Sequence, residues 1–170
     1  IYAYDIAWEP FFGDINQRRA YDPLWRSWID AHYGSVAKAE KVWGTPAPRH
    51  RDEVSTPEAS HLGSDGPHRR MVADYRRFAD ELIDERYRAA ADRLRVLDPN
   101  HLISFRMTVT GDPTCDGSHN MPYDFPGVAE CMDFLAPEAY GRIGDWERIR
   151  PGMFTVTWAR HCAPRKPVLW

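Results

Sequence analysis

A long amphipathic segment between two short apolar ones constrains the fold more than any other feature of this chain. Over residues 68–97, apolar side chains recur about every 3.6 residues while Arg, Asp and Glu fill the other side, which predicts a helix with one buried face. The apolar positions are Met71, Tyr75, Phe78, Leu82, Ala89, Leu94 and Leu97. Residues 1–9 and 101–110, on either side, are apolar and predict strands. A helix between two strands indicates parallel neighbours joined by a crossover.

The alternation continues toward the end of the chain. Residues 132–141 predict a third strand, preceded by a short helix, and a helix within residues 153–161 leads to a fourth strand at 166–170. This order predicts an α/β fold that is part of a (β/α)8 TIM barrel. A complete barrel needs roughly 250 residues. We therefore expect the 170 residues to be a single catalytic-domain fragment, about half a barrel, taken from a longer protein.

Two short helices are predicted between the first strand and the long helix. Pro23–Tyr33 has apolar residues at helical spacing, with Asp22 as the expected N-cap and Gly34 as the stop. A second helix is expected at Ser35–Trp43. Residues 44–67 are rich in Pro, Ser, His and charge, which predicts a long surface loop.

Composition and charge exclude several classes of partner. Lys and Arg, 22 in all, are outnumbered by 25 Asp and Glu and are spread along the chain, so the positive surface that nucleic acid requires is missing. The sequence has no run long enough to cross a membrane, and we expect no secretory leader within these residues. We expect neither a nucleic-acid nor a membrane partner. The oligomeric state is unknown from sequence, and among compartments a secreted or periplasmic one is slightly favoured over the cytoplasm.

The motifs give no support for a metal or a cofactor, and we expect none. Cys115, Asp116 and His119 are close in sequence, but their spacing matches no common zinc framework and favours a solvated loop. With Cys131 and Cys162 the cysteines make an odd count without metal spacing.

Aromatic content points to a ligand with apolar faces and polar edges. Seven Trp and eight Tyr exceed what a core of this size needs, and sugars are such ligands. We therefore expect a carbohydrate as the partner. Trp8, Trp43 and Trp170 are candidate rings for stacking against a sugar, with core packing as the equal alternative.

Chemistry-bearing residues gather at the predicted strand ends. Glu9 ends the first strand before Pro10, residues 108–112 end the second, and Glu138 and Tyr140 end the third. The carboxyl ends of parallel strands are where active sites form in such folds. From spacing alone, Glu9 is either a catalytic carboxylate or one that only caps a loop.

Several stretches resemble the retaining glycosidases of glycoside hydrolase clan A, especially the cellulase-like and β-galactosidase-like members. "YDIAWEPFFG" followed by "WRSWIDAHYGSVAKAEKVWG" is similar to the clan's fourth-strand region. "LRVLDPNHLISFRM" resembles its helix four and strand five, and "MDFLAPEAYG" its strand six. The resemblance implies a TIM barrel that cleaves O-glycosidic bonds of a β-linked oligo- or polysaccharide, with Glu9 as general acid/base.

The sequence departs from the clan's pattern in two places. Trp8 stands where the clan usually has the Asn that contacts the sugar 2-hydroxyl, and Glu138 stands where a His is common on strand six. The resemblance also implies a nucleophilic Glu at the end of strand seven. "KPVLW" looks like the start of that strand, so this Glu is expected just past Trp170.

A retaining mechanism needs two carboxyl groups about 5 Å apart, one to protonate the leaving oxygen and one to attack. Glu138 could contact the sugar directly, be the second carboxylate, or pair with an arginine, and the first is favoured. Tyr140 matches the clan's tyrosine that hydrogen-bonds the nucleophile, with an ordinary rim residue as the alternative. For Asp5 and Arg106 a structural ion pair is favoured over direct sugar contact by Arg106. The alternative function is a non-catalytic carbohydrate-binding or scaffold protein with the same fold.

Overall fold

The computed structural model describes residues 2–8, 18–107, 125–137 and 144–169, which fall into two compact units. Unit 1 contains the described residues of Ile1–Phe11, Asp80–Asp116 and Pro122–Trp170. Unit 2 contains those of Phe12–Ala79. The long helix α5, Arg69–Leu97, contributes to both units, and each unit is described by itself.

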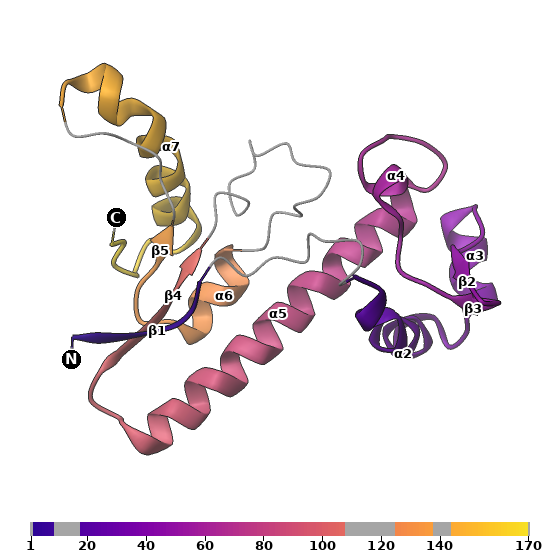
Figure 1. Cartoon of the computed structure of the whole chain (residues 1–170), viewed down its shortest axis with the longest axis horizontal. Coiled ribbons are helices and arrows are strands. Elements are labelled where there is room, and N and C mark those ends of the chain that lie inside the picture. Colours follow the sequence, from indigo (N-terminus) through magenta and orange to yellow (C-terminus); the bar gives the residue numbers. More distant parts are fainter. Residues whose placement is uncertain (1, 9–17, 108–124, 138–143, 170) are drawn as a thin grey trace. The chain divides into compact units, whose positions relative to one another are not determined.

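Unit 1 is built on a parallel sheet of three strands in the order β1-β4-β5 (Figure 1). These strands are β1 (Ala3–Trp8), β4 (Leu102–Met107) and β5 (Ala136–Pro137). β4 pairs in parallel with both neighbours, which confirms the parallel arrangement that the alternating sequence predicts. Within the predicted strand 132–141, residues 132–135 precede β5, and residues 138–141 lie outside the described residues. An isolated parallel bridge between Leu135 and Val168 is what the structure shows of the predicted fourth strand.

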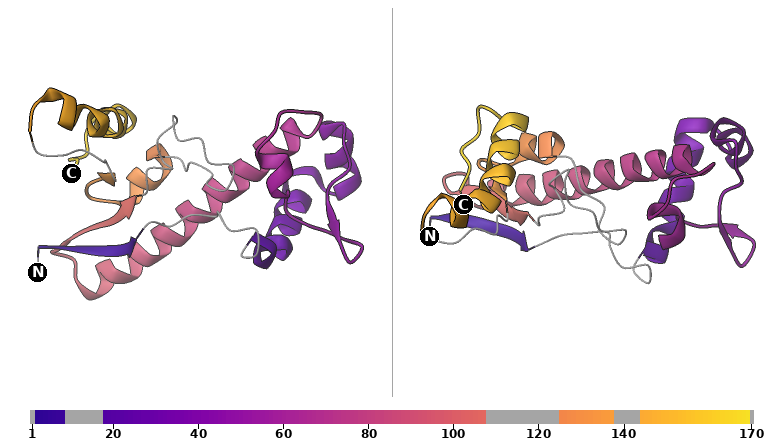
Figure 2. Two further views of the ribbon diagram at one scale, coloured as in Figure 1. Left: turned by 45° about the horizontal axis from the view of Figure 1, so that its top comes forward. Right: turned by 90° about the horizontal axis from the view of Figure 1, so that it is seen from above.

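Two further helices complete unit 1. Helix α6 (Phe125–Cys131) lies between β4 and β5 in sequence, where a short helix is predicted. Helix α7 (Trp146–Cys162) begins seven residues before the predicted segment 153–161. The two helices contact each other and lie side by side in the right-hand view of Figure 2.

Helix α5 has the predicted length, but its buried row differs from the predicted one. The prediction holds for Met71, Tyr75 and Phe78, and the buried row then continues through Ile83, Tyr87 and Ala91. Leu82 and Leu94 are half-buried, whereas Ala89 is exposed and Leu97 is 82% exposed, so the last two positions were wrongly assigned to the buried face. Positions four residues apart advance by about 400° around a helix, and the buried row therefore moves around α5 by about 40° at each step.

The second half of α5 covers one face of the sheet of unit 1. The ring of Tyr87 stacks on that of Phe105 with centroids 4.3 Å apart, and Phe105 and Ile103 are fully buried. Asp133 joins the elements because its carboxylate accepts hydrogen bonds from Arg95 of α5 and from the amide of Ile103 at 2.6 Å. Since strand residues alternate between faces, Ser104 and Arg106 belong to the opposite face.

Unit 2 consists of short helices and a small hairpin beside the first part of α5. Its elements are the 3-10 turn η1 (Arg19–Tyr21), α2 (Asp22–Tyr33), α3 (Val36–Trp43), β2 (Arg49–His50), β3 (Glu53–Val54) and α4 (Ala59–Leu62). Gly34 ends α2 with φ of 73°, as predicted, and Ser35 caps α3. The N-cap of α2 is Tyr21 rather than the predicted Asp22. The carboxylate of Asp22 is used elsewhere, because it accepts the amide of Thr56 at 2.8 Å.

The segment 44–67, predicted as a surface loop, is partly ordered into the β2–β3 hairpin and α4. Arg51 and Asp52 at the hairpin turn both have positive φ, as a tight two-residue turn requires. The side chain of Arg26 on α2 donates to the carbonyl of Val54 at 2.9 Å and pairs with Glu53. Residues 54–57 are buried. The segment is therefore packed against helix α2 rather than laid loosely over the surface.

Candidate active site at the strand ends

The three strands of unit 1 end at one edge of the sheet. Trp8 lies level with Arg106, which lies level with Ala136, and the next row contains Met107 and Pro137. Glu9 follows β1 directly in sequence, and Glu138 follows β5 directly. Glu9, Glu138 and Tyr140 themselves lie outside the described residues.

The register also gives the spacing of the chain segments that lead to these carboxylates. β1 and β5 are separated by β4, and neighbouring strands lie about 4.8 Å apart, so the backbones of Trp8 and Ala136 are about 10 Å apart. Carboxyl groups in a retaining site are about 5 Å apart. Side chains at strand ends extend toward one another over the barrel opening, so this backbone spacing does not decide between a sugar contact and the second carboxylate for Glu138.

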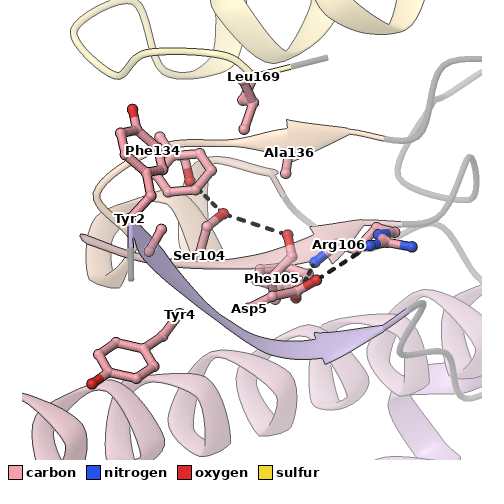
Figure 3. A pocket seen from close by; sticks show the side chains of 10 residues that line it. Tyr2, Tyr4, Asp5, Ser104, Phe105, Arg106, Phe134, Ala136 and Leu169 are labelled. Carbon is pink, nitrogen blue, oxygen red and sulfur yellow. Dashed lines mark hydrogen bonds and ion pairs between the residues drawn. The ribbon is translucent and has the colours of Figure 1, made fainter. Parts of the chain in front are cut away.

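Asp5 and Arg106 form the predicted pair on the sheet face opposite α5 (Figure 3). A guanidinium nitrogen of Arg106 lies 3.6 Å from Asp5 Oδ2, and the backbone amide of Arg106 donates to Asp5 Oδ1 at 3.1 Å. Both side chains are about half exposed. The hydrogen bond from the backbone amide was not anticipated, because sequence alone does not show the register of two strands about 100 residues apart.

A pocket of about 370 Å³ lies beside this pair. Its lining combines apolar rings with few polar groups, from Tyr2, Ala3, Tyr4, Asp5, Ser104, Phe105, Arg106, Phe134, Ala136 and Leu169 (Figure 3). The hydroxyl of Ser104, a buried residue, donates to the carbonyl of Phe134 at 2.7 Å, so β4 is tied to the segment that leads into β5. The interior of a complete TIM barrel is filled by side chains. We therefore regard this pocket as part of the barrel interior rather than as the sugar site.

Of the rings predicted to stack on a sugar, the structure describes the side chain of Trp43 alone. Trp43 is 3% exposed, stacks on Trp25 with centroids 5.9 Å apart, and donates its indole N–H to Asp74 at 2.7 Å. Tyr33 donates its hydroxyl to the same carboxylate. Trp43 is thus a core residue of unit 2, so of the two alternatives that the sequence left open for it, core packing holds and stacking on a sugar does not. Trp170 and the ring of Trp8 lie outside the described part of the chain.

Within the described ranges, no group of three or more His, Cys, Asp or Glu is arranged to hold a metal ion. Cys115, Asp116 and His119 are outside those ranges. Likewise, no helix that the structure describes is both long and apolar enough to cross a membrane.

Comparison with known proteins assigns the chain to a family. Residues 13–162, most of the chain, match the Glyco_hydro_42 family, which is described as β-galactosidase. The chain belongs to the Glyco_hydro_42 family. The match begins after Glu9, so the assignment of Glu9 rests on the sequence resemblance and not on this match. No curated protein matches the chain.

Two solved structures share the fold of this Glyco_hydro_42 chain. One is a β-galactosidase from the Antarctic haloarchaeon Halorubrum lacusprofundi, with 20% identity and a TM-score of 0.54. The other is the β-galactosidase of Bacillus circulans sp. alkalophilus, with 19% identity and a TM-score of 0.58. Each match covers 83% of this chain and 20% of the other. The chain thus spans about a fifth of their length. Together with the parallel sheet, they confirm an α/β fold that is part of a (β/α)8 barrel.

Proposed function

We propose that this Glyco_hydro_42 chain supplies the acid/base half of a retaining glycosidase that releases β-linked galactose from oligo- or polysaccharides. The family match over residues 13–162 is the observation that carries the proposal. The sugar is taken from the description of the family. The carboxyl ends of β1 and β5, which lead into Glu9 and Glu138, lie at one edge of the sheet and support a site there.

In this proposal Glu9 protonates the leaving oxygen in the first step and takes a proton from water in the second. General acid/base help of this kind contributes roughly 10²–10⁴-fold to the rate. A second carboxylate must attack the anomeric carbon and form the covalent intermediate. We assign that role to a Glu outside the described residues, expected beyond Trp170. Glu138, two strands from β1, and Tyr140 are assigned to contacts with the sugar or with the nucleophile.

The test uses the full-length protein that contains these residues and a panel of p-nitrophenyl glycosides. We expect turnover of the β-galactoside, and proton NMR should show β-galactose as the first product because a retaining mechanism keeps the configuration. The α-galactoside is the matched control, since it differs only at the anomeric carbon. Release of α-galactose from the β-galactoside would contradict the retaining mechanism. Binding of galactosides without turnover of any substrate would favour the non-catalytic carbohydrate-binding alternative.

A further inference from the structure

Strand β1 carries one residue more than its partner just before it reaches the candidate site. Asp5 pairs with Ser104 and Trp8 pairs with Arg106, so three steps along β1 match two steps along β4. An extra residue of this kind reverses the alternation of side chains beyond it, and such irregularities are frequent beside active sites. The period-2 pattern of the sequence, which gives Asp5 and Glu9 the same face, therefore cannot be extended through this strand.

The carboxylate of Asp5 spans this register shift (Figure 3). Asp5 is the last paired residue before the shift, and Arg106 is the residue that pairs with Trp8 after it. Asp5 Oδ1 accepts the backbone amide of Arg106 at 3.1 Å, while Oδ2 lies 3.6 Å from the guanidinium of the same residue. One side chain on β1 thus holds both the main chain and the side chain of the β4 residue at the shift.

We propose that Asp5 is a positioning residue, whose carboxylate holds the register shift in β1 and thereby fixes the level at which the chain leaves the strand toward Glu9. Without the shift, continuous pairing from Asp5 would place Trp8 level with Met107, one residue or about 3.3 Å farther along β4. A displacement of about 1 Å at a reacting group can cost about 10²-fold in rate. The catalytic part of this inference rests on the proposed function. The part that concerns Asp5 and the register shift does not.

The experiment compares Asp5→Ala and Asp5→Asn in the full-length protein. Asn keeps an oxygen that can accept the Arg106 amide but loses the charge, whereas Ala loses both. Asp65→Ala is the matched control, because Asp65, in the loop before α5, also pairs with an arginine, Arg69, but both side chains are exposed. The amide hydrogen exchange of Arg106 is measured in each variant, together with kcat and KM for lactose and for 2,4-dinitrophenyl β-galactoside.

We expect Asp5→Ala to raise the exchange rate of the Arg106 amide about tenfold or more, because a hydrogen bond is lost. Its kcat/KM for lactose should fall about 10²-fold, while kcat/KM for dinitrophenyl galactoside, whose first step needs little protonation, should fall much less. Asp5→Asn should restore most of the protection of the Arg106 amide and most of the activity on lactose. Asp65→Ala should change neither the exchange rate nor the activity.

An equal loss of kcat/KM on both substrates would indicate general structural damage and overturn the positioning role, and so would an Asp5→Asn variant as damaged as Asp5→Ala. If the Arg106 amide exchanged at the wild-type rate in Asp5→Ala, Asp5 would not hold the register shift. If the wild-type protein turned over neither galactoside, the proposed function would fail, and the exchange rate would still decide whether Asp5 holds the strand.

Discussion

The carboxylate of Asp98 accepts four hydrogen bonds in the connection between α5 and β4. Its Oδ2 accepts the hydroxyl of Tyr4 at 2.8 Å and the ring Nδ1–H of His101 at 2.6 Å, and its Oδ1 accepts the backbone amides of Asn100 and His101. These donors, with the hydroxyl of Tyr4 first, lower the pKa of the Asp98 carboxyl from 3.8 to about 2. The charged form of Asp98 is therefore favoured in the folded chain.

This lowered pKa predicts a loss of stability in acid. Because the folded pKa lies below the unfolded one, the contribution of Asp98 is present above about pH 4 and is lost as the pH falls toward 2. Tyr4→Phe removes the first of the four donors and keeps the ring, so it should make the decrease between pH 4 and pH 2 shallower. Urea unfolding at several pH values measures this. Parallel stability curves for the wild type and Tyr4→Phe would contradict the role of the Tyr4 hydrogen bond.

Single residues also mark the limit of sequence-based prediction. The Asp5–Arg106 pair could be predicted because the two opposite charges lie on predicted neighbouring strands, although both side chains are about half exposed rather than buried. The burial of Trp43 could not, since the same helical spacing suits a core ring and a ring that stacks on a sugar. Trp43 is buried because it packs against Trp25 and donates a hydrogen bond to Asp74. These three residues come from three different helices.

At the scale of elements, helix α5 shows how a correct helix can be assigned a wrong face. Strong periodicity and the residues that follow fix its length, and the predicted bounds agree with Arg69–Leu97 to within one residue. Its face cannot be fixed in the same way, because the two halves of the helix belong to different units with different neighbours. The predicted row follows Leu82, whereas the buried row follows Ile83.

The difference between the two rows predicts losses of stability of very different size for two similar truncations in α5. Ile83 is 6% exposed, so Ile83→Ala should lower the free energy of unfolding by about 2–5 kcal/mol. Leu97→Ala, at an exposed position of the same helix, should change it by less than about 0.5 kcal/mol. Denaturant titration of both variants checks this. A larger loss for Leu97→Ala than for Ile83→Ala would restore the row predicted from sequence.

For the whole molecule, the alternation of strands and helices predicts the parallel sheet and the barrel class, because only a crossover can join parallel neighbours. The family match and the two β-galactosidase structures agree with that class. The register shift in β1 leaves no signal in the sequence, since it depends on pairing with a strand about 100 residues away. The identity of the sugar comes from the family description and not from any pattern in the chain.

The central proposal, that Glu9 is the general acid/base, is tested most directly by azide rescue of Glu9→Gln in the full-length protein. Gln keeps the shape but cannot donate a proton to the leaving oxygen, so kcat for lactose should fall by about 10²–10⁴-fold. With dinitrophenyl β-galactoside, azide should restore turnover and yield β-galactosyl azide, because the anion replaces the water that Glu9 no longer activates. Wild-type rates on lactose, or a mutant that forms no galactosyl azide, would contradict the proposal and move the search for the acid to Glu138.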